Sequence, residues 1–496
     1  MEARQNSLAK YINLGLPFIE ARELQALCSI CSPPSPFTLP LLQPRFAKLL
    51  QWPRDKLYVD FIATPMTPSP MTAKIDLSIV IPALREGPNL AILLPQLQDV
   101  LEKLKIKSEV LIVTRDADPE TRAAAQRFGA RVIEQVERGF GGAILSGFQA
   151  AVGKYIVTMD ADLSHPPTFV RDLWLRRHRG EVVIASRYVP GGSAQMPPSR
   201  KVLSRILNGF FRRGLSLPVS DLSSNFRLYR ADILRNLALA ARDFNVLPEI
   251  LIRVHAEGFK AEEVPFAYAP REHGSSNARV FKFGLAYLKT FGSMWKLRNS
   301  ILSGDYDDRA YDSPIPLQRY WQRSRFKHVV ELVRSEGPVL DVGCGSSRII
   351  GALPPGSIAL DVLIRKLRSS RRFPTPSVCA SGFNLPFADG AFPCVVCSQV
   401  IEHVPKDSPI IDELCRVLAP GGRLVLGTPD YARWEWVWME KLYGKVAPGA
   451  YADEHIAHYT RAELEDNMTR RGFKLEAVRY ILRGELIMAF RKSPAS

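Results

Sequence analysis

A short apolar run that ends in two carboxylates constrains the fold of this chain more than any other stretch. Residues 155–159, Tyr-Ile-Val-Thr-Met, predict a buried strand, and Asp160 and Asp162 follow it. Open parallel sheets bind ligands beyond the carboxyl ends of their strands. Two carboxylates at such an end are hard oxygen ligands, suited to Mg²⁺ or Mn²⁺ carrying a nucleotide diphosphate. The alternative is that Asp162 merely caps a following helix.

Other motifs surround this pair in a fixed order. They are IVIPALREGPNL (79–90), RGFGGA (138–143), ASRYVPGGS (185–193), DLSSNFRLYR (221–230) and REHGSS (271–276). With the carboxylate pair, residues from about 77 to 298 resemble the GT-A glycosyltransferases of family 2, the group that includes dolichol-phosphate mannosyltransferase and bacterial polyprenyl-phosphate glycosyltransferases. The resemblance implies a Rossmann-like nucleotide-diphospho-sugar transferase domain that transfers a hexose with inversion.

The same resemblance implies which residues bind the donor nucleotide. The acidic pair that usually ends the second strand of the family aligns with Thr114-Arg115. Either Asp116 or Asp118 replaces it, or Arg115 changes the base preference, so the donor stays open between GDP-mannose and UDP-glucose. Glu86 could instead be an acidic residue favoured at a helix start. The expected donor-binding residues are Pro82, Ala83, Glu86, Asp116, Asp118, Asp160, Ala161, Asp162 and Arg271.

The expected catalytic groups of sugar transfer are Asp160, Asp162 and Arg271, with Ser164 as a further metal ligand. Arg271 is a candidate phosphate clamp because a guanidinium fork matches phosphate oxygens. Ser186, Arg187 and Arg200 are the expected contacts of the acceptor phosphate. A polyprenyl phosphate is already anionic near neutral pH, so we nominate no catalytic base.

The charge of the chain points to an anionic partner. The 496 residues carry a formal net charge of +16, which favours an anionic membrane surface, phosphorylated substrates or nucleic acid. A cationic belt accompanies no base-reading motif, so we interpret it as a surface for lipid headgroups or an acceptor phosphate and expect no nucleic-acid partner. The belt comprises Arg171, Arg176, Arg177, Arg179, Arg187, Arg200, Lys201, Arg205, Arg212 and Arg213.

Residues 279–299 predict a helix with a basic stripe, because Lys282, Lys289 and Lys296 are seven residues apart. Aromatic and leucine side chains fill its other faces, which is typical of an interfacial helix; the alternative is a domain-edge helix with one wet face. No apolar run approaches the roughly 18–20 residues that span a bilayer, and there is no leader pattern. We therefore expect a cytoplasmic protein peripherally associated with the inner face of the membrane, of undetermined oligomeric state.

A second set of motifs follows in the C-terminal half. A strand at 337–340 runs into Asp341-Val-Gly343-Cys-Gly345, and glycines there permit a tight turn and close approach to a ligand. NAD is disfavoured because Arg348 stands where its fingerprint needs glycine. With NLPFADGAF (384–392), SQVIEHV (398–404) and LAPGGRLVLGTP (418–429), residues from about 318 to 491 resemble class I S-adenosylmethionine-dependent methyltransferases.

This second resemblance implies S-adenosylmethionine (SAM) as a cofactor. Ser381 stands where many relatives have an aspartate near the adenine, and Asp361 could alternatively be a helix cap. His403 is a candidate for methyl transfer or a structural residue, and His455, His458 and Tyr459 could line the acceptor site. A metal in that loop would need more ligands than the spacing identifies. The expected SAM-binding residues are Asp341, Gly343, Gly345, Asp361, Ser381 and Leu385.

Two Cys-X-X-Cys pairs, 28–31 and 394–397, have a spacing compatible with zinc. The second lies in a strand-like run, where residues three apart point to opposite faces, which disfavours zinc.

The chain therefore divides into a Pro-rich extension (1–72), a GT-A domain (73–300), a polar linker (301–316) and a methyltransferase domain (317–496). We expect a bifunctional enzyme: metal-dependent hexose transfer to a polyprenyl phosphate, and methyl transfer to an unidentified acceptor in a glycolipid or polysaccharide pathway. The alternatives are a non-catalytic C-terminal SAM-binding or scaffolding module, and a glycosyltransferase with a soluble acceptor.

Overall fold

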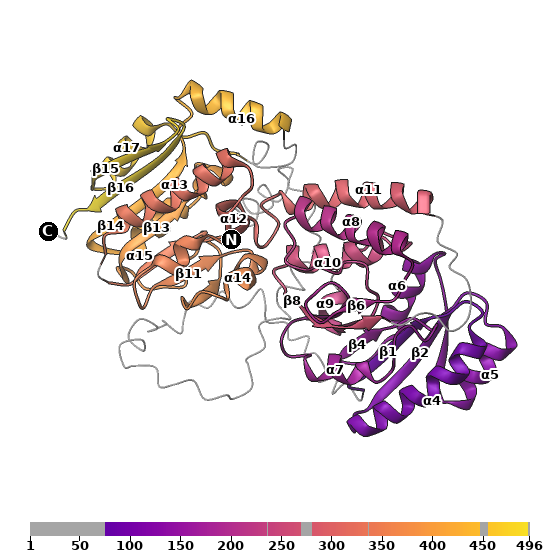
Figure 1. Cartoon of the computed structure of the whole chain (residues 1–496). Coiled ribbons are helices and arrows are strands. Elements are labelled where there is room, and N and C mark those ends of the chain that lie inside the picture. The colour runs from indigo at the N-terminus through magenta and orange to yellow at the C-terminus, as the bar shows by residue number, and fades with distance from the viewer. Residues whose placement is uncertain (1–74, 236, 269–279, 336, 447–454, 495–496) are drawn as a thin grey trace, which may run out of the picture. The chain divides into compact units, whose positions relative to one another are not determined.

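The computed structural model describes residues 75–235, 237–268, 280–335, 337–446 and 455–494 (Figure 1). The expected extension, the first cysteine pair and the REHGSS motif with Arg271 lie outside these ranges. The described residues form two mixed α/β sheets of seven strands each, one before residue 270 and one after residue 338. The predicted fold class, two Rossmann-like α/β domains, is confirmed.

The first sheet reverses its strand order between β1 and β4. The chain builds β1, β2 and β3 outward in one direction and then returns to place β4 on the other side of β1, with Val80 opposite Thr158. Only β7 runs antiparallel to its neighbours in this sheet. The order is β3 (Arg131–Glu134), β2 (Ser108–Thr114), β1 (Leu77–Pro82), β4 (Tyr155–Thr158), β7 (Arg227–Arg230), β5 (Val182–Ser186) and β8 (Ala261–Pro265).

Both faces of this sheet are covered by helices, as the continuous apolar strand β1 requires. Ile79 and Ile81 face one core cluster and Val80 faces the other. A short parallel pair, β6 (Ser193–Ala194) and β9 (Ala267–Tyr268), lies outside the sheet. Helices α4 (Gly87–Leu104), α5 (Pro119–Arg127) and α7 (Phe169–Leu175) cover the face of Ile79; α6 (Phe140–Ala150), α8 (Pro198–Gly214), α9 (Ala231–Arg235), α10 (Val246–Ala256) and α11 (Val280–Arg298) cover the other (Figure 1).

The second sheet repeats this arrangement. Its strand order reverses between β10 and β13, and β16 is the antiparallel member. The order is β12 (Ser377–Cys379), β11 (Ile358–Asp361), β10 (Val339–Val342), β13 (Phe392–Ser398), β14 (Leu418–Pro429), β16 (Glu485–Lys492) and β15 (Phe473–Ile481).

Helices also cover both faces of the second sheet. Cys394 and Cys397 of β13 are buried in different core clusters, which confirms that the two side chains point to opposite faces of the strand. One face carries α13 (Pro316–Val333), η2 (Arg348–Ala352) and α14 (Ile364–Ser370); the other carries α15 (Ile410–Val417) and α17 (Arg461–Arg470). Helix α16 (Trp434–Val446) follows β14, and η3 (Ile401–His403) follows β13.

The stretch expected as a polar linker contains a short helix, α12 (Tyr306–Tyr311). Tyr306 and Ala310 of this helix are buried. The stretch is therefore a packed element of the structure.

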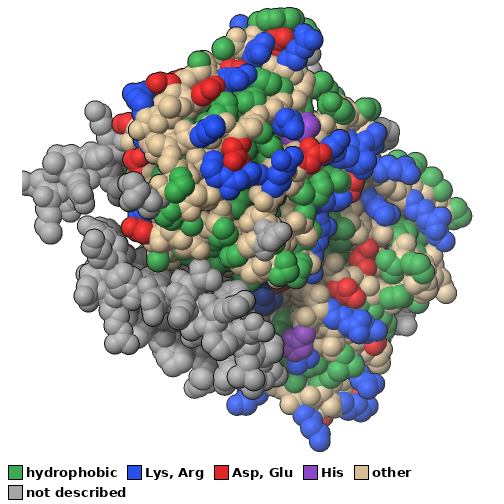
Figure 2. All heavy atoms as spheres, turned by 90° about the vertical axis from the view of Figure 1, so that its left-hand side faces the viewer, with side chains coloured by type: hydrophobic (Ala, Val, Ile, Leu, Met, Phe, Trp, Pro, Cys, Tyr) green, Lys and Arg blue, Asp and Glu red, His purple; other side chains and the backbone are tan. Residues whose placement is uncertain are grey.

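Within the described ranges, no helix combines the length and apolar character needed to cross a bilayer. On the face drawn in Figure 2, Lys and Arg side chains are dispersed among apolar ones and form no single continuous patch.

Replacing Gly142 by alanine should destabilise the first domain. An added Cβ at this position in α6 would lie 2.0 Å from the backbone carbonyl oxygen of Glu137, which cannot rotate away. We expect a loss of about 1–3 kcal/mol, because overpacking forces backbone shifts of this cost. Scanning calorimetry should show the transition of this domain at a lower temperature.

The matched control is Gly209→Ala in α8, where an added Cβ meets nothing within 4 Å. This change should leave the unfolding transition temperature unchanged or raise it, since alanine reduces the conformational entropy of the unfolded chain. Equal transition temperatures for both variants would contradict the close packing of Gly142 against the Glu137 backbone.

Candidate functional sites

The carboxyl end of β4 brings Asp160 beside residues that hold it in place. The Asn225 side-chain amide donates to Asp160 Oδ1 at 2.9 Å. The Asp160 backbone N–H donates to His165 Nδ1 at 2.9 Å. Asn225 is 65 residues away in the sequence, so only the fold joins it to Asp160.

His165 orients the loop that carries both carboxylates. Because its Nδ1 accepts a hydrogen bond, the ring proton lies on Nε2, which faces Asp160 Oδ2 at 3.7 Å. The buried ring stacks on Phe226, with centroids 4.7 Å apart. The sequence predicted no role for either residue, although Asn225 lies in the DLSSNFRLYR motif.

Asp160 and Asp162 fit a divalent cation. The Asp160 side chain is 29% exposed, so it faces solvent, whereas Asp162 is buried and accepts hydrogen bonds from the Ser164 backbone N–H and hydroxyl. Asn225 Oδ1 is buried and has no hydrogen-bond partner among the described residues. Two positioned carboxylates are a suitable donor set for Mg²⁺ or Mn²⁺. Ser164 orients Asp162, and its role as a metal ligand remains a prediction.

The predicted donor-nucleotide residues lie around the carboxyl ends of β1 and β2. Pro82 ends β1, and the Ala83 N–H donates to the Val113 carbonyl at 2.9 Å. Glu86 stands at the start of α4, where its carboxylate accepts from Asn89 at 2.6 Å. This position agrees with the helix-start alternative.

The carboxylates of Asp116 and Asp118 differ in their hydrogen-bonding roles. Asp118 caps α5: its carboxylate accepts from the backbone N–H and the hydroxyl of Thr121, and these bonds lower its pKa. Asp116 is exposed. Of the two candidates, Asp116 is thus the one whose carboxylate is not engaged as a helix cap.

Arg187 forms a buried ion pair within the protein. Its Nε and Nη2 donate to the two oxygens of Asp221, each at 2.8 Å, and Nη2 also donates to Ser223. Burial opposes ionisation of Asp221, but the hydrogen bonds and charge of Arg187 outweigh it and hold the pKa of that carboxyl below its usual range. The pair joins the end of β5 to the loop that carries Asn225.

The expectation that Arg187 clamps the acceptor phosphate is therefore not favoured, because its guanidinium is already engaged. Ser186 is fully buried, and its hydroxyl accepts from the Tyr188 N–H at 3.3 Å. Arg200 lies on α8, and its side chain is outside the described ones.

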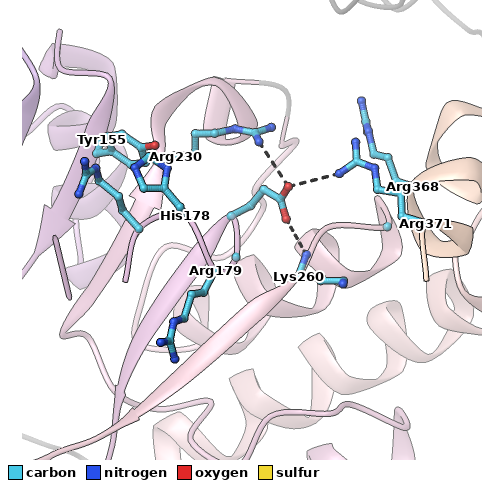
Figure 3. Close-up of a pocket in the computed structure, with 11 residues that line it drawn as sticks. Tyr155, His178, Arg179, Arg230, Lys260, Arg368 and Arg371 are labelled. Atoms are coloured by element: carbon cyan, nitrogen blue, oxygen red, sulfur yellow. Dashed lines mark hydrogen bonds and ion pairs between the residues drawn. The ribbon is translucent and has the colours of Figure 1, made fainter. Parts of the chain in front are cut away.

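A basic cavity of about 310 Å³ lies at the opposite, amino-terminal end of β4 (Figure 3). Glu181 lies among its cationic groups: it faces Arg230 at 3.3 Å and Arg371 at 3.6 Å, and accepts from the Lys260 N–H. Two members of the cationic belt, Arg177 and Arg179, line this cavity. The Asp160 carboxylate lies at the other end of β4. The lining of the cavity includes Tyr155, Arg177, His178, Arg179, Gly180, Gly258 and Arg368.

In the second sheet, the turn after β10 is built from glycines with positive φ. Gly343 has φ 72° and Gly345 has φ 57°, values that side chains disfavour. The Gly345 N–H donates to Asp361 Oδ2 at 2.8 Å, and the Leu363 N–H donates to Oδ1 at 2.7 Å. Asp361 at the end of β11 therefore fixes the shape of the turn.

Asp341, at the start of this turn, carries a buried oxygen without a partner. Its side chain is 3% exposed, and Oδ2 has no hydrogen-bond partner among the described residues. Burial, and then the charge of Asp361, raise the pKa of Asp341 to about 7. An orphaned carboxyl oxygen beside a glycine turn fits the cationic part of SAM, so these residues fit that cofactor.

Ser381 and Leu385 follow β12. Ser381 is exposed, and its hydroxyl accepts from the Phe383 N–H. Leu385 is buried in a core cluster, and its N–H donates to Glu413 at 2.7 Å. Their SAM contacts remain predictions.

Helix α12 supplies a residue that sequence reasoning missed. Asp307 Oδ2 accepts from the Ser346 N–H at 3.1 Å and from Lys366 Nζ at 2.8 Å. Burial opposes ionisation of Asp307, but the charge of Lys366 outweighs it and lowers its pKa to about 2. Asp307 thus ties the expected linker to the glycine turn.

The histidines named from the sequence separate into two groups. His403 of η3 and His455 have ring centroids 5.0 Å apart and share their surroundings with Glu402. The exposed His458 stacks on Tyr431 at 4.0 Å, and Tyr459 is buried in the core.

Comparison with known proteins defines both classes of domain. Residues 78–238 match the model of glycosyl transferase family 2, and residues 340–426 match a methyltransferase domain. The chain therefore carries a glycosyltransferase domain followed by a methyltransferase domain, as the motifs predicted.

Curated relatives cover the first domain. The chain is 32% identical over 211 residues to an undecaprenyl-phosphate mannosyltransferase from Micrococcus luteus. This match covers 40% of the chain and 85% of the relative. The chain is 30% identical over 231 residues to a polyprenol monophosphomannose synthase from Mycolicibacterium smegmatis, 42% of this chain and 84% of the relative. A dolichol-phosphate mannosyltransferase from Pyrococcus furiosus is 32% identical over 211 residues, 41% of this chain, and the match spans only 59% of that protein. The chain belongs to glycosyl transferase family 2.

Replacing Asp341 by asparagine should stabilise the SAM-free protein in a pH-dependent way. The native pKa of about 7 lies above the ordinary value of 3.8. The wild type therefore loses stability as pH rises from about 4 to 7, because the unfolded state ionises first, while the asparagine variant does not. The advantage of the variant should grow over this window and level off above it, reaching at most about 4 kcal/mol.

Calorimetry of both proteins at pH 5, 6, 7 and 8 measures this difference. Asp389→Asn is the control, because Asp389 is highly exposed. A stability difference that is independent of pH, or that shrinks toward pH 8, would contradict the burial of an unpartnered carboxyl at Asp341.

Proposed function

We propose that the first domain transfers a hexose, mannose or glucose, from GDP-mannose or UDP-glucose to a polyprenyl phosphate with inversion, using Mg²⁺ or Mn²⁺. The single observation that carries this proposal is the pair Asp160 and Asp162 at the strand-order reversal of a family 2 fold. The printed names of the relatives support the acceptor class, since they refer to dolichol, undecaprenyl and polyprenol phosphates.

The residues of the chain divide the work as follows. Asp160 and Asp162 would hold the metal, which when bound neutralises charge on the departing nucleoside diphosphate. Asn225 and His165 keep Asp160 in place, and the Arg187–Asp221 pair orders the loop of Asn225. An anionic acceptor needs positioning more than deprotonation, so no general base is required. Arg271 remains the proposed phosphate clamp.

We propose that helix α8 meets the anionic membrane surface on the cytoplasmic side. Val202, Leu203, Ile206 and Phe210 are exposed apolar side chains on this helix, and their spacing places them along one side. Arg205, Arg212 and Arg213 on the same helix are also exposed. Exposed apolar groups flanked by arginines are typical of interfacial helices.

The expected role of α11 as the interfacial helix is less well supported. Tyr287, Phe291, Met294 and Trp295 pack against the core of the first domain. Lys289 and Lys296 are exposed, which agrees with the alternative of a domain-edge helix with one wet face.

We propose that the second domain transfers a methyl group from SAM to an acceptor in the same glycolipid or polysaccharide pathway. Asp341, Asp361 and the glycine turn would hold the cofactor, which supplies the methyl group when bound. The alternative is a non-catalytic module that either binds SAM or acts as a scaffold. This alternative predicts no methyl transfer, whether or not SAM binds. The second alternative, a soluble acceptor for the sugar, predicts transfer without a lipid.

Asp160→Asn and Asp162→Asn should each abolish sugar transfer. The assay uses labelled GDP-mannose or UDP-glucose, a polyprenyl phosphate in detergent, and Mn²⁺ or Mg²⁺. We expect loss of at least 100-fold, because a neutral amide binds the metal poorly and charge on the leaving group is then unneutralised. Asp172→Asn, on the exposed face of α7, is the matched control and should retain activity.

Metal-independent transfer, or full activity in both variants, would refute the metal role of the pair. Product from only one donor identifies the base that the Thr114–Asp118 segment accepts. Product with a soluble acceptor but none with the lipid would refute the proposed acceptor class.

Replacing Val202 and Ile206 together by serine should weaken membrane binding. These side chains are 56% and 61% exposed, so the change should not disturb the core. Loss of two apolar anchors of roughly 1 kcal/mol each predicts about 30-fold weaker binding to liposomes with anionic lipids. Flotation measures it, with the exposed Val136→Ser as control. Undiminished flotation would exclude α8 as the docking element.

A further inference from the structure

A cluster of three ligand-type side chains lies at the carboxyl end of β13. Glu402 and His403 are consecutive residues of η3. The Glu402 carbonyl accepts from the N–H groups of Ile456, at 2.8 Å, and Ala457, at 2.9 Å. These backbone bonds fix the segment that carries His455 against η3, so the cluster is built from two segments that are locked together.

The cluster contains a buried carboxylate oxygen without a partner. Glu402 is fully buried, and its Oε2 has no hydrogen-bond partner among the described residues. The His455 side chain is 4% exposed. Burying a carboxylate is costly unless a positive charge or hydrogen-bond donors compensate for it. A bound cation would supply that compensation.

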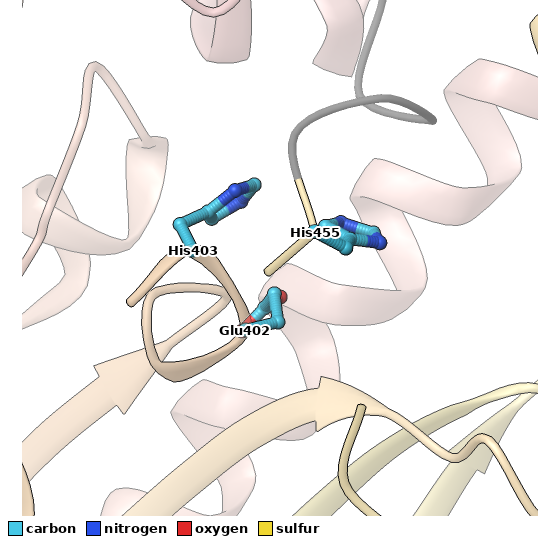
Figure 4. A group of neighbouring side chains, drawn as sticks. All are labelled: Glu402, His403 and His455. Atoms are coloured by element: carbon cyan, nitrogen blue, oxygen red, sulfur yellow. The ribbon is translucent and has the colours of Figure 1, made fainter. Parts of the chain in front are cut away.

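The three side chains converge. Glu402, His403 and His455 each offer one ligand atom, and these atoms all lie within 4.8 Å of one another. Figure 4 shows the Glu402 carboxylate below the two imidazole rings, with His403 and His455 on either side. A bound transition metal would place such atoms about 3–3.5 Å apart, given bond lengths near 2.0–2.2 Å. Small side-chain rotations close this difference.

His455 is held as metal-binding histidines usually are. Its Nδ1 lies 2.8 Å from the Glu440 carboxylate, and the Tyr431 hydroxyl donates to the same carboxylate at 2.7 Å. A carboxylate that accepts from one ring nitrogen fixes the ring and leaves Nε2 as the ligand. Glu440 belongs to α16 and Tyr431 to the loop after β14, so a third and a fourth segment support the ring.

We propose that Glu402, His403 and His455 bind a divalent first-row transition-metal cation, with Glu440 orienting His455. Two imidazoles and one carboxylate suit zinc, cobalt or manganese better than magnesium or calcium, which prefer oxygen ligands. Three protein ligands leave coordination positions open.

The place of the site suggests what the open positions take. An added Cβ at Gly343 would lie 2.2 Å from Val400, so the segment leading into η3 packs against the glycine turn. A cation there would lie at the same sheet edge as the methyl donor and could bind an oxygen of the methyl acceptor. This last step rests on the methyltransferase function proposed above, whereas the cation site does not.

The test measures zinc binding without SAM. The full chain carries Asp160→Asn and Asp162→Asn, so that the first domain's metal site does not contribute. Equilibrium dialysis with Zn²⁺ and metal analysis gives the stoichiometry, and visible absorption after Co²⁺ addition reports the ligand set. We expect one equivalent of Zn²⁺, lost in His403→Ala and in His455→Ala. Glu440→Gln should weaken binding 10–100-fold, as loss of an orienting partner does.

His458→Ala is the matched control, because His458 is an exposed histidine of the same segment. It should retain the full equivalent. The half-buried His403 should tolerate alanine, and unfolding transitions of all variants compared with the parent check this. No bound Zn²⁺ in the parent, or unchanged binding in folded His403→Ala, would overturn the proposal. Because SAM is absent, an inactive methyltransferase would not alter either result.

Discussion

Both halves of this chain depend on one constraint, the reversal of strand order in a mostly parallel sheet. Between β1 and β4, and again between β10 and β13, the connections leave in opposite directions, and open sheets of this kind bind ligands beyond the carboxyl ends of the strands at such a point. The chemically distinctive residues follow these four strands: Ala83, Asp160, Gly343 and Glu402. The carboxylate of Asp160 after β4 and that of Glu402 after β13 occupy equivalent places in the two sheets.

A second shared feature is that buried charge holds each site in shape. In the first domain, the Arg187–Asp221 pair orders the loop whose Asn225 contacts Asp160. In the second, Asp361 accepts a hydrogen bond from the Gly345 N–H of the glycine turn. Asp307, which is paired with Lys366, accepts one from the Ser346 N–H that follows the turn. Removing one partner of such a buried pair leaves an uncompensated charge. Some of the arginines and lysines of the chain are therefore structural, and only exposed ones, such as the arginines of α8, are available to an anionic surface.

The sequence predicted the local patterns well and the long-range contacts poorly. Strands β1, β4 and β10 were recognisable because they are apolar runs ending in Pro82, Asp160 and the glycine turn, and the opposed burial of Cys394 and Cys397 follows from strand periodicity. The ion pair of Arg187 was not predicted because its partner Asp221 lies 34 residues away. Asp307 was assigned to a linker because its partners Ser346 and Lys366 are distant in the sequence. The cluster of Glu402, His403 and His455 was missed because Glu402 and His455 meet only in the fold.

The central claim is that the sheet edge at the carboxyl ends of β1 and β4 binds a nucleotide through a metal held by Asp160 and Asp162. Calorimetric titration of the wild-type chain with GDP and UDP, each with and without Mn²⁺, tests this claim most directly. We predict binding of one nucleotide per chain that requires Mn²⁺, favours one of the two bases and is unchanged by SAM. Equal binding without metal, or no binding of either nucleotide by folded protein, would contradict it.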